Sequence, residues 1–216
     1  DENDEEIIYD SLKYIQPAAE KDYNIFAMNL YGEIIFELEK FKQYPKAAKL
    51  FKIAADEGYS QAQYNYGACR KEALGIAENC EEAVQYFKMA ADQGNPDGLN
   101  EYGNCLQEGL GIEQNVLEAK KYIKMSADLG NSYAQYNYVM LLQLGIGFDA
   151  DNPKEKEIAD FEINEYLKKA SDADYPDAMI LYSQLIITEL DNYPPDEKYE
   201  KLKMAKFYLK RLLQIS

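Results

Sequence analysis

Histidine is absent from the 216-residue sequence, and cysteine occurs only three times. The absence of histidine removes the commonest general base and the commonest protein ligand for transition metals. An odd number of cysteines does not form a closed set of disulfides. We therefore expect no metal site, no cofactor and no disulfide framework, and the composition favours a protein that is not an enzyme.

Basic residues are also scarce: 23 Lys and Arg stand against 39 Asp and Glu, and the formal net charge is −16. A negative field of this size repels phosphate backbones and anionic membranes, which argues against a nucleic-acid ligand. Two interpretations of the charge stay open. It suits a basic protein partner, or it is a solvated acidic surface with no specific ligand.

Long apolar runs are missing too. No stretch of 18 apolar residues occurs, so no helix is expected to span a membrane. No signal peptide and no Asn-x-Ser/Thr acceptor is visible, which predicts a cytoplasmic location. The sequence starts at Asp1 rather than at Met, which predicts processing or excision from a longer chain.

The sequence does contain a repeat. A short Ala/Ser-Ala-Asp-x-Gly stretch starts at Ala54, again at Ala90 and again at Ser126, a step of 36 residues each time. A fixed period of this length is typical of a solenoid, in which each unit buries its core against its neighbours. The predicted fold is all-α, a right-handed α–α superhelix of helix-turn-helix repeats.

The first helix of each repeat is predicted from residues at positions i, i+4, i+7 and i+11, which share one helical face. We assign these positions to the core: Ala62, Tyr66, Cys69 and Ala73; Gly98, Tyr102, Cys105 and Gly109; Ala134, Tyr138, Leu141 and Gly145. Gly67 and Gly103 occupy equivalent places inside this helix. Glycine there weakens a helix, so its presence predicts a close contact with the second helix.

The second helix is predicted to start at an asparagine cap, Asn79 or Asn115, with Glu three residues later. Its core consists of alanines and larger apolar residues at positions 47, 83 and 119, and 51, 87 and 123. In the fourth repeat the closing stretch returns only at Ala170, 44 residues after Ser126. The eight extra residues fall near 149–160 and predict a second helix lengthened by about two turns, starting at Asn152-Pro153.

Three segments follow from this pattern. Residues 1–17 are predicted to form an N-terminal helix that equals half a repeat or a cap. Residues 18–195 are predicted to form the repeats. Residues 196–216, which are rich in lysine, are predicted to form a basic capping helix that keeps the end of the array soluble.

The repeat resembles the Sel1-like repeats, which are related to tetratricopeptide repeats. The resemblance rests on Ala62, Tyr66 and Gly67 in the first helix, the loop at Gly75, and Ala83, Phe87, Ala90, Ala91 and Gly94 in the second. It continues in the next repeat at Ala119, Ile123, Ala127 and Gly130, and weakens over 18–45 and 170–216. It implies a right-handed α-solenoid whose concave face holds other proteins, as in adaptors.

Three functions compete. The first is a non-enzymatic scaffold or adaptor that binds a protein or peptide. The second is a regulatory repeat segment of a larger enzyme. The third is a hydrolase like the cysteine-rich relatives described as β-lactam-hydrolysing, but those carry two cysteines in each repeat. Here Cys69 and Cys105 have no partner in the second helix, and no Ser-x-x-Lys occurs.

The binding face is predicted on the first helix of each repeat, opposite its core positions, because this helix lines the groove in tetratricopeptide-like pairs. Tyrosine and methionine there can anchor a partner, and amides can bond to an extended backbone. An alternative is that the tyrosines pack against the adjacent helix. The predicted protein-binding residues are Tyr64, Lys71, Asn100, Asn104, Gln107, Tyr136, Met140 and Gln143. Ala68 lies on the same face. The sequence leaves the partner and the oligomeric state open.

Overall fold

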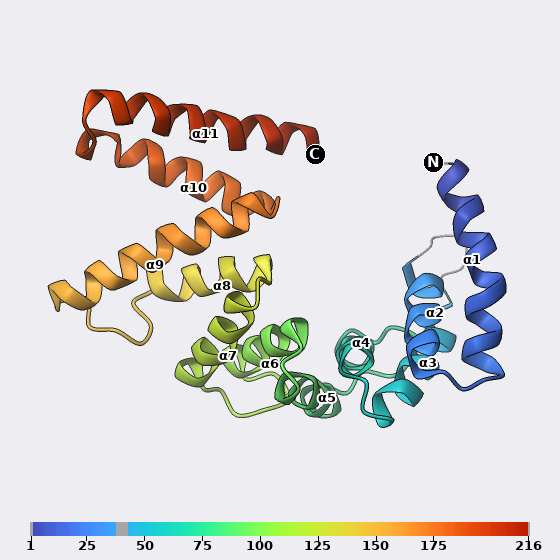
Figure 1. Cartoon of the computed structure of the whole chain (residues 1–216). Coiled ribbons are helices and arrows are strands. Elements are labelled where there is room, and N and C mark those ends of the chain that lie inside the picture. The colour runs from blue at the N-terminus through green and yellow to red at the C-terminus, as the bar shows by residue number, and fades with distance from the viewer. Residues whose placement is uncertain (1, 38–42, 216) are drawn as a thin grey trace. The chain divides into compact units, whose positions relative to one another are not determined.

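The computed structural model of the protein describes residues 2–37 and 43–215, and the side chains of all of these except 2–6 and 9. Over these ranges it consists of eleven α-helices and one short 3-10 helix, with no strand (Figure 1). The predicted all-α repeat class is therefore confirmed. The chain forms two compact units, residues 1–115 and 116–216.

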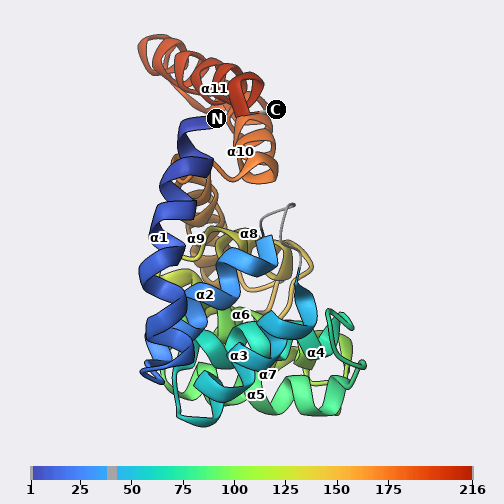
Figure 2. The same cartoon turned by 90° about the vertical axis from the view of Figure 1, so that its right-hand side faces the viewer.

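The first unit packs each helix on the next one along the chain (Figure 2). In addition, α4 contacts α6, so the first helices of these two successive repeats are direct neighbours. The helices are α1 (Glu2–Glu20), α2 (Ile25–Glu37), α3 (Tyr44–Asp56), α4 (Ser60–Lys71), α5 (Cys80–Asp92) and α6 (Pro96–Glu108).

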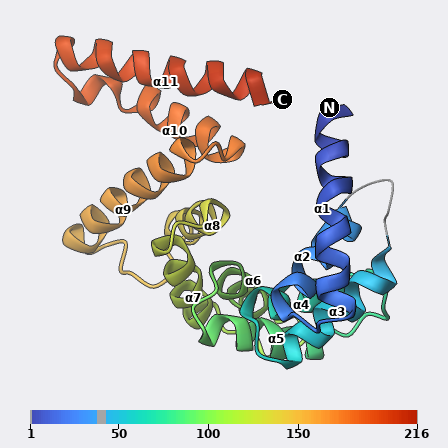
Figure 3. The ribbon, with the colours of Figure 1, turned by 45° about the vertical axis from the view of Figure 1, so that its right-hand side comes forward.

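The second unit continues the same pattern, and Figure 3 shows α9, α10 and α11 following one another. Its helices are α7 (Val116–Asp128), α8 (Ser132–Gln143), α9 (Pro153–Asp172), α10 (Pro176–Thr188), the 3-10 turn η1 (Leu190–Asn192) and α11 (Pro195–Ile215). Helix α9 has 20 residues against 13 in α3, α5 and α7. The predicted lengthening is confirmed. So is its start, because Asn152 accepts a hydrogen bond from the backbone N–H of Lys154.

The predicted core positions are buried except for the last one of each set. Alanines 47, 83 and 119 are fully buried, and so are Ala62 and Cys69. The assignment of Ala73, Gly109 and Gly145 to the core is wrong, because the first helices end before these residues can face it. Ala73 and both glycines adopt positive φ values of 55°, 74° and 73°, and Ala73 is exposed.

Small residues allow the helices of the first unit to approach closely. A Cβ atom added to Gly67 would lie 2.7 Å from Cε1 of Phe87, and one added to Gly32 would lie 2.5 Å from Cε1 of Phe51. Both rings are buried in the core. The predicted contact between Gly67 and the second helix is confirmed.

The second helices end in a residue with a left-handed backbone. In α3 the N–H of Gly58 donates to Ala55 and the N–H of Tyr59 donates to Ala54, which is the Schellman arrangement. The φ angles of Gly58, Gly94 and Gly130 are 91°, 76° and 93°. The fourth repeat closes in the same way with Asp174 at φ 63° in place of glycine.

A polar clamp joins second helices of successive repeats within each unit. Asp56 at the end of α3 accepts hydrogen bonds from Lys52 one turn earlier and from the hydroxyl of Tyr86 on α5, at 2.7 Å. The same clamp recurs in the second unit, where Asp128 and Asp172 accept hydrogen bonds from the hydroxyls of Tyr166 and Tyr208. The aspartate of the repeated stretch therefore connects neighbouring repeats.

The last helix differs from the polar cap that the lysines suggest. Helix α11 carries the predicted basic residues, yet it also exposes several large apolar side chains, and Leu213 is 78% exposed. The others are Tyr199, Leu202, Phe207, Leu209 and Ile215.

Candidate protein-binding face

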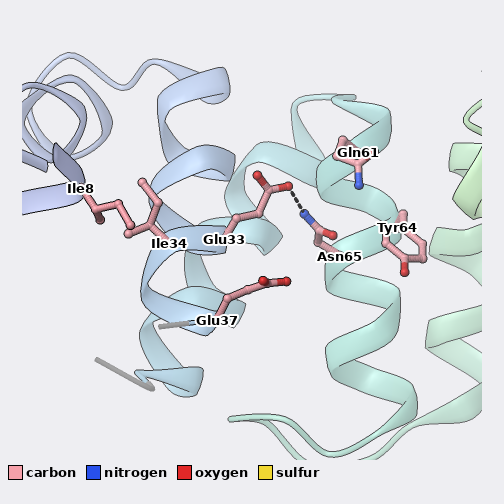
Figure 4. A pocket seen from close by; sticks show the side chains of 7 residues that line it. All are labelled: Ile8, Glu33, Ile34, Glu37, Gln61, Tyr64 and Asn65. Carbon is pink, nitrogen blue, oxygen red and sulfur yellow. Dashed lines mark hydrogen bonds between the residues drawn. The ribbon is translucent and has the colours of Figure 1, made fainter. Parts of the chain in front are cut away.

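The first helices of the repeats in the first unit, α2, α4 and α6, carry the candidate face. Between α1, α2 and α4 this face is hollowed to about 470 Å³ (Figure 4). Isoleucines from α1 and α2 lie at one side of the hollow, and polar side chains of α2 and α4 lie at the other. Its lining residues are Ile8, Glu33, Ile34, Glu37, Gln61, Tyr64 and Asn65.

A network of amides and one carboxylate connects α2 to α4 at the hollow. The Asn65 side-chain N–H group donates to Glu33 Oε1 at 3.0 Å and to Asn29 Oδ1 at 2.9 Å. Asn29 in turn donates to the same Glu33 oxygen at 2.9 Å. Asn29 is almost completely buried, so the network holds the Glu33 carboxylate in a defined orientation.

A second polar group lies between α4 and α6. Lys71 Nζ on α4 contacts Glu101 Oε2 on α6 at 2.5 Å. The other oxygen of Glu101 accepts hydrogen bonds from Asn100 and Asn104, both at 3.2 Å. Burial lowers the pKa of Lys71, but the hydrogen bond and charge of Glu101 outweigh it, so the pKa is raised and the ammonium is retained.

Tyr64 lies between these two polar groups. Its position fits both predicted roles, packing against the adjacent helix and contacting a partner. It is half-buried, and its ring centroid lies 6.2 Å from that of Phe87, so it packs against the adjacent helix. It also lines the hollow. Burial, with a smaller effect of Asp97 and Glu101, raises the pKa of Tyr64 to about 12, so the hydroxyl stays protonated.

The remaining predicted residues of this unit differ in their exposure. Asn104 and Gln107 are half-buried on α6. Asn100 is only 3% exposed, so the expectation that it is an exposed surface amide is wrong. Its side-chain amide donates to Glu101, so it belongs to the polar group between α4 and α6 rather than to an open surface.

The predicted residues of the second unit lie on α8. The Tyr136 ring packs against Tyr175, with 5.3 Å between ring centroids, and Met140 is half-buried against the core of this unit. Gln143 is exposed and lines a separate pocket of about 380 Å³ with Phe148 and Leu185. Tyr136 and Met140 therefore serve packing as well, and only Gln143 is fully available.

Sequence reasoning missed Glu33, Asn29 and Asn65. The available signal was the spacing of the two asparagines, which lie 36 residues apart and are hydrogen-bonded to each other. Asn65 directly follows the predicted Tyr64, whereas the weak repeat match over 18–45 left α2, and with it Asn29 and Glu33, without predicted site residues.

The surroundings of all three cysteines disfavour the thiolate form. Burial raises the pKa of Cys69 and of Cys105 to about 12. Burial and a hydrogen bond to Glu78 also raise the pKa of Cys80 at the start of α5, so the thiol rather than the thiolate is favoured. No cluster of potential metal ligands is found among the described residues, and none of the helices in the described ranges is long and apolar enough to cross a membrane.

Comparison with solved structures supports the fold. A Sel1 repeat protein from Oxalobacter formigenes is 22% identical, with a TM-score of 0.76 over 99% of this chain and 84% of that one. A protective antigen of uropathogenic Escherichia coli with an SLR fold is 23% identical, with a TM-score of 0.67 over 81% of this chain. The chain spans only 36% of the length of that antigen.

A third structure is more distant. The immunity protein Pa5087 from Pseudomonas aeruginosa is 16% identical and gives a TM-score of 0.52 over 88% of this chain and 81% of that one. No curated protein matches the sequence.

The family model named Sel1 repeat matches residues 25–59, 60–95 and 96–131. The first two matches correspond to α2 with α3 and α4 with α5, and the third spans α6 and α7. Proteins with these repeats generally act as non-enzymatic scaffolds that bind other proteins. On these three repeats and on the fold, the chain belongs to the Sel1 repeat proteins.

Proposed function

We propose that the protein is a scaffold or adaptor that binds an extended segment of another protein along α2, α4 and α6. One observation carries the proposal: the hollow of about 470 Å³ combines apolar walls with amide and carboxylate groups. Apolar walls anchor side chains, and Asn and Gln side chains bond to an extended peptide backbone. The same face carries Tyr64, Lys71, Asn104 and Gln107.

A random peptide library displayed on phage tests the proposal. Peptides selected on the wild-type protein are measured by calorimetry against Tyr64→Ala/Asn104→Ala, which removes two half-buried side chains of the face. The control is Glu81→Ala/Met89→Ala on α5, where both residues are exposed on the other helix of the repeat. Circular dichroism melting verifies that all three proteins fold.

We expect the face variant to lose at least about tenfold in affinity, the size of an interface hot spot of more than 1 kcal/mol. The α5 control is expected to bind as the wild type does. Equal binding by the face variant, or a library that yields no binder, contradicts the proposal.

A further inference from the structure

The hollow between α1, α2 and α4 offers more hydrogen-bond acceptors than donors. Glu33 uses Oε1 for both asparagine amides, which leaves Oε2 without a hydrogen bond to any described residue. The Asn65 N–H group is committed to two acceptors, which sets the orientation of the amide and leaves Oδ1 facing no described donor. Glu37, one turn after Glu33, adds a second carboxylate.

No cation among the described residues neutralises these carboxylates. Several lysine and arginine side chains in the described part of the first unit are paired elsewhere, for example Lys46 with Glu20 at 2.7 Å and Arg70 with Glu82. The next pair of first helices is arranged differently. Between α4 and α6 the carboxylate of Glu101 holds the ammonium of Lys71 at 2.5 Å. A carboxylate between two first helices of this protein therefore pairs with a basic side chain where one is present.

The apolar side of the hollow fits the stem of a long basic side chain. Ile8 of α1 and Ile34 of α2 are half-buried, and Figure 4 shows them close together beside the carboxylates. Arginine buries its methylene stem on apolar surface while its charged head meets polar partners. A guanidinium group carries five N–H donors in a planar fork and no acceptor, which complements a carboxylate.

The geometry points to a subsite for an arginine side chain of the bound peptide. The guanidinium lies against Glu33 Oε2, with Asn65 Oδ1 and Glu37 as further acceptors, and the stem lies on Ile8 and Ile34. This inference rests on the proposed peptide-binding function and names the chemistry of its partner: a basic segment, in keeping with the net charge of −16.

The test uses the capped amino acid N-acetyl-arginine N-methylamide, with the norleucine compound as its neutral match. Binding to the full chain is followed by NMR, through the methyl signals of Ile8 and Ile34 and the side-chain amide of Asn65. Two variants are tested, Glu33→Gln and Glu37→Gln. Each keeps the shape of the side chain and removes its charge. The matched control is Glu113→Gln, the same charge change in the exposed α6–α7 connection.

We expect the arginine compound to shift these signals. Glu33→Gln should weaken the affinity for this compound about tenfold, which is the effect of losing a hydrogen bond to a charged group. Glu113→Gln is expected to change affinity by less than about twofold. Equal binding of the norleucine compound, or unchanged binding to both glutamine variants with intact melting curves, overturns the subsite.

The outcome separates the two proposals. If phage-selected peptides still bind the face while the arginine compound shows no saturable shifts, the subsite is wrong and the peptide-binding function stands. If neither binds, both are wrong. Retained peptide affinity after Arg→norleucine substitution in a selected peptide likewise removes the subsite alone.

Discussion

Gln135 on α8 is a buried glutamine with one hydrogen bond too few. Its Nε2 donates to the Ala127 carbonyl at 3.2 Å, but its Oε1 is buried without a partner. The equivalent Gln63 donates to Ala55 at the same 3.2 Å, and its Oε1 accepts from Gln93 at 2.8 Å. The residue after α9 that corresponds to Gln93 is Ala173, whose side chain has no hydrogen-bond donor.

We expect Ala173→Gln to stabilise the second unit. Its backbone angles of −89° and 16° resemble the −92° and 2° of Gln93, so a glutamine there can reach Gln135. A satisfied buried acceptor is worth about 0.5–1.5 kcal/mol. Urea unfolding monitored by circular dichroism measures the change. Ala173→Met supplies similar length without a donor and is expected to show no gain; an equal gain in both variants would contradict the explanation.

At the scale of the helix pair, the distance between α4 and α5 depends on Gly67. A methyl group at this position meets the fully buried Phe87 ring at 2.7 and 2.8 Å and the Ala83 carbonyl oxygen at 3.2 Å. Alanine is the better helix former by about 1 kcal/mol, so propensity and packing act in opposite directions. Because the ring is fully buried and the Ala83 carbonyl is backbone, we expect packing to dominate.

Gly67→Ala is therefore expected to destabilise the first unit by about 1–3 kcal/mol, the usual cost of overpacking a core. Thermal and urea denaturation measure the loss. The double variant Gly67→Ala/Phe87→Leu provides the control, because a smaller side chain should relieve the contact and make the two changes less than additive. A Gly67→Ala protein with a higher melting temperature would show that the helices separate freely.

The same helix pairs explain what the sequence could and could not predict. Where the period is a strict 36 residues, helix positions and core followed from the pattern, as at Ala62 and Phe87. On α2 the register differs: Gly32 and Gly67, which make the same kind of contact, lie 35 residues apart, whereas Phe51 and Phe87 lie 36 apart. A shift of one residue rotates a helix by about 100°, since 3.6 residues complete a turn.

That shift hid half of the candidate site. Tyr64 and Lys71 were predicted from the regular repeats, but Glu33 lies on the irregular helix and was not. The burial of Asn100 could not be predicted either, because the pattern gives the face of a residue and not the depth of the helix end that carries it. Core positions follow from periodicity, whereas the hydrogen-bond network between helices depends on individual side chains.

For the whole molecule, acid should weaken the fold through aspartates placed in both units. Burial raises the pKa of Asp56, yet hydrogen bonds from Lys52 and Tyr86 outweigh it and hold the pKa below the ordinary value of an aspartate. In the second unit the pKa of Asp172 is lowered in the same way, by Lys168 and Tyr208. A carboxylate with a lowered pKa stabilises the fold above its unfolded pKa and loses this contribution as pH falls through the folded value.

We therefore expect Asp56→Asn to lower the urea midpoint clearly near pH 6. The difference should vanish as the pH falls through the lowered pKa of Asp56, because the wild-type carboxylate is then itself protonated. The comparison between proteins at each pH cancels the general effect of the −16 charge. Asp22→Asn, an exposed residue of the α1–α2 connection, is the control and should give little difference at any pH. A wild-type–Asp56→Asn difference that is independent of pH would contradict the clamp.

The left-handed residue after the second helix of a repeat has a consequence for how such repeats are detected in a sequence. At Gly58, Gly94 and Gly130 no atom lies within 4 Å of the place where a Cβ would be, so the backbone angle alone demands glycine. Asp174 meets the same demand with a side chain. The pair α8 and α9 is thus a complete structural repeat that lacks the closing glycine of the preceding repeats. A search that counts repeats by this glycine would therefore find fewer repeats than the structure contains.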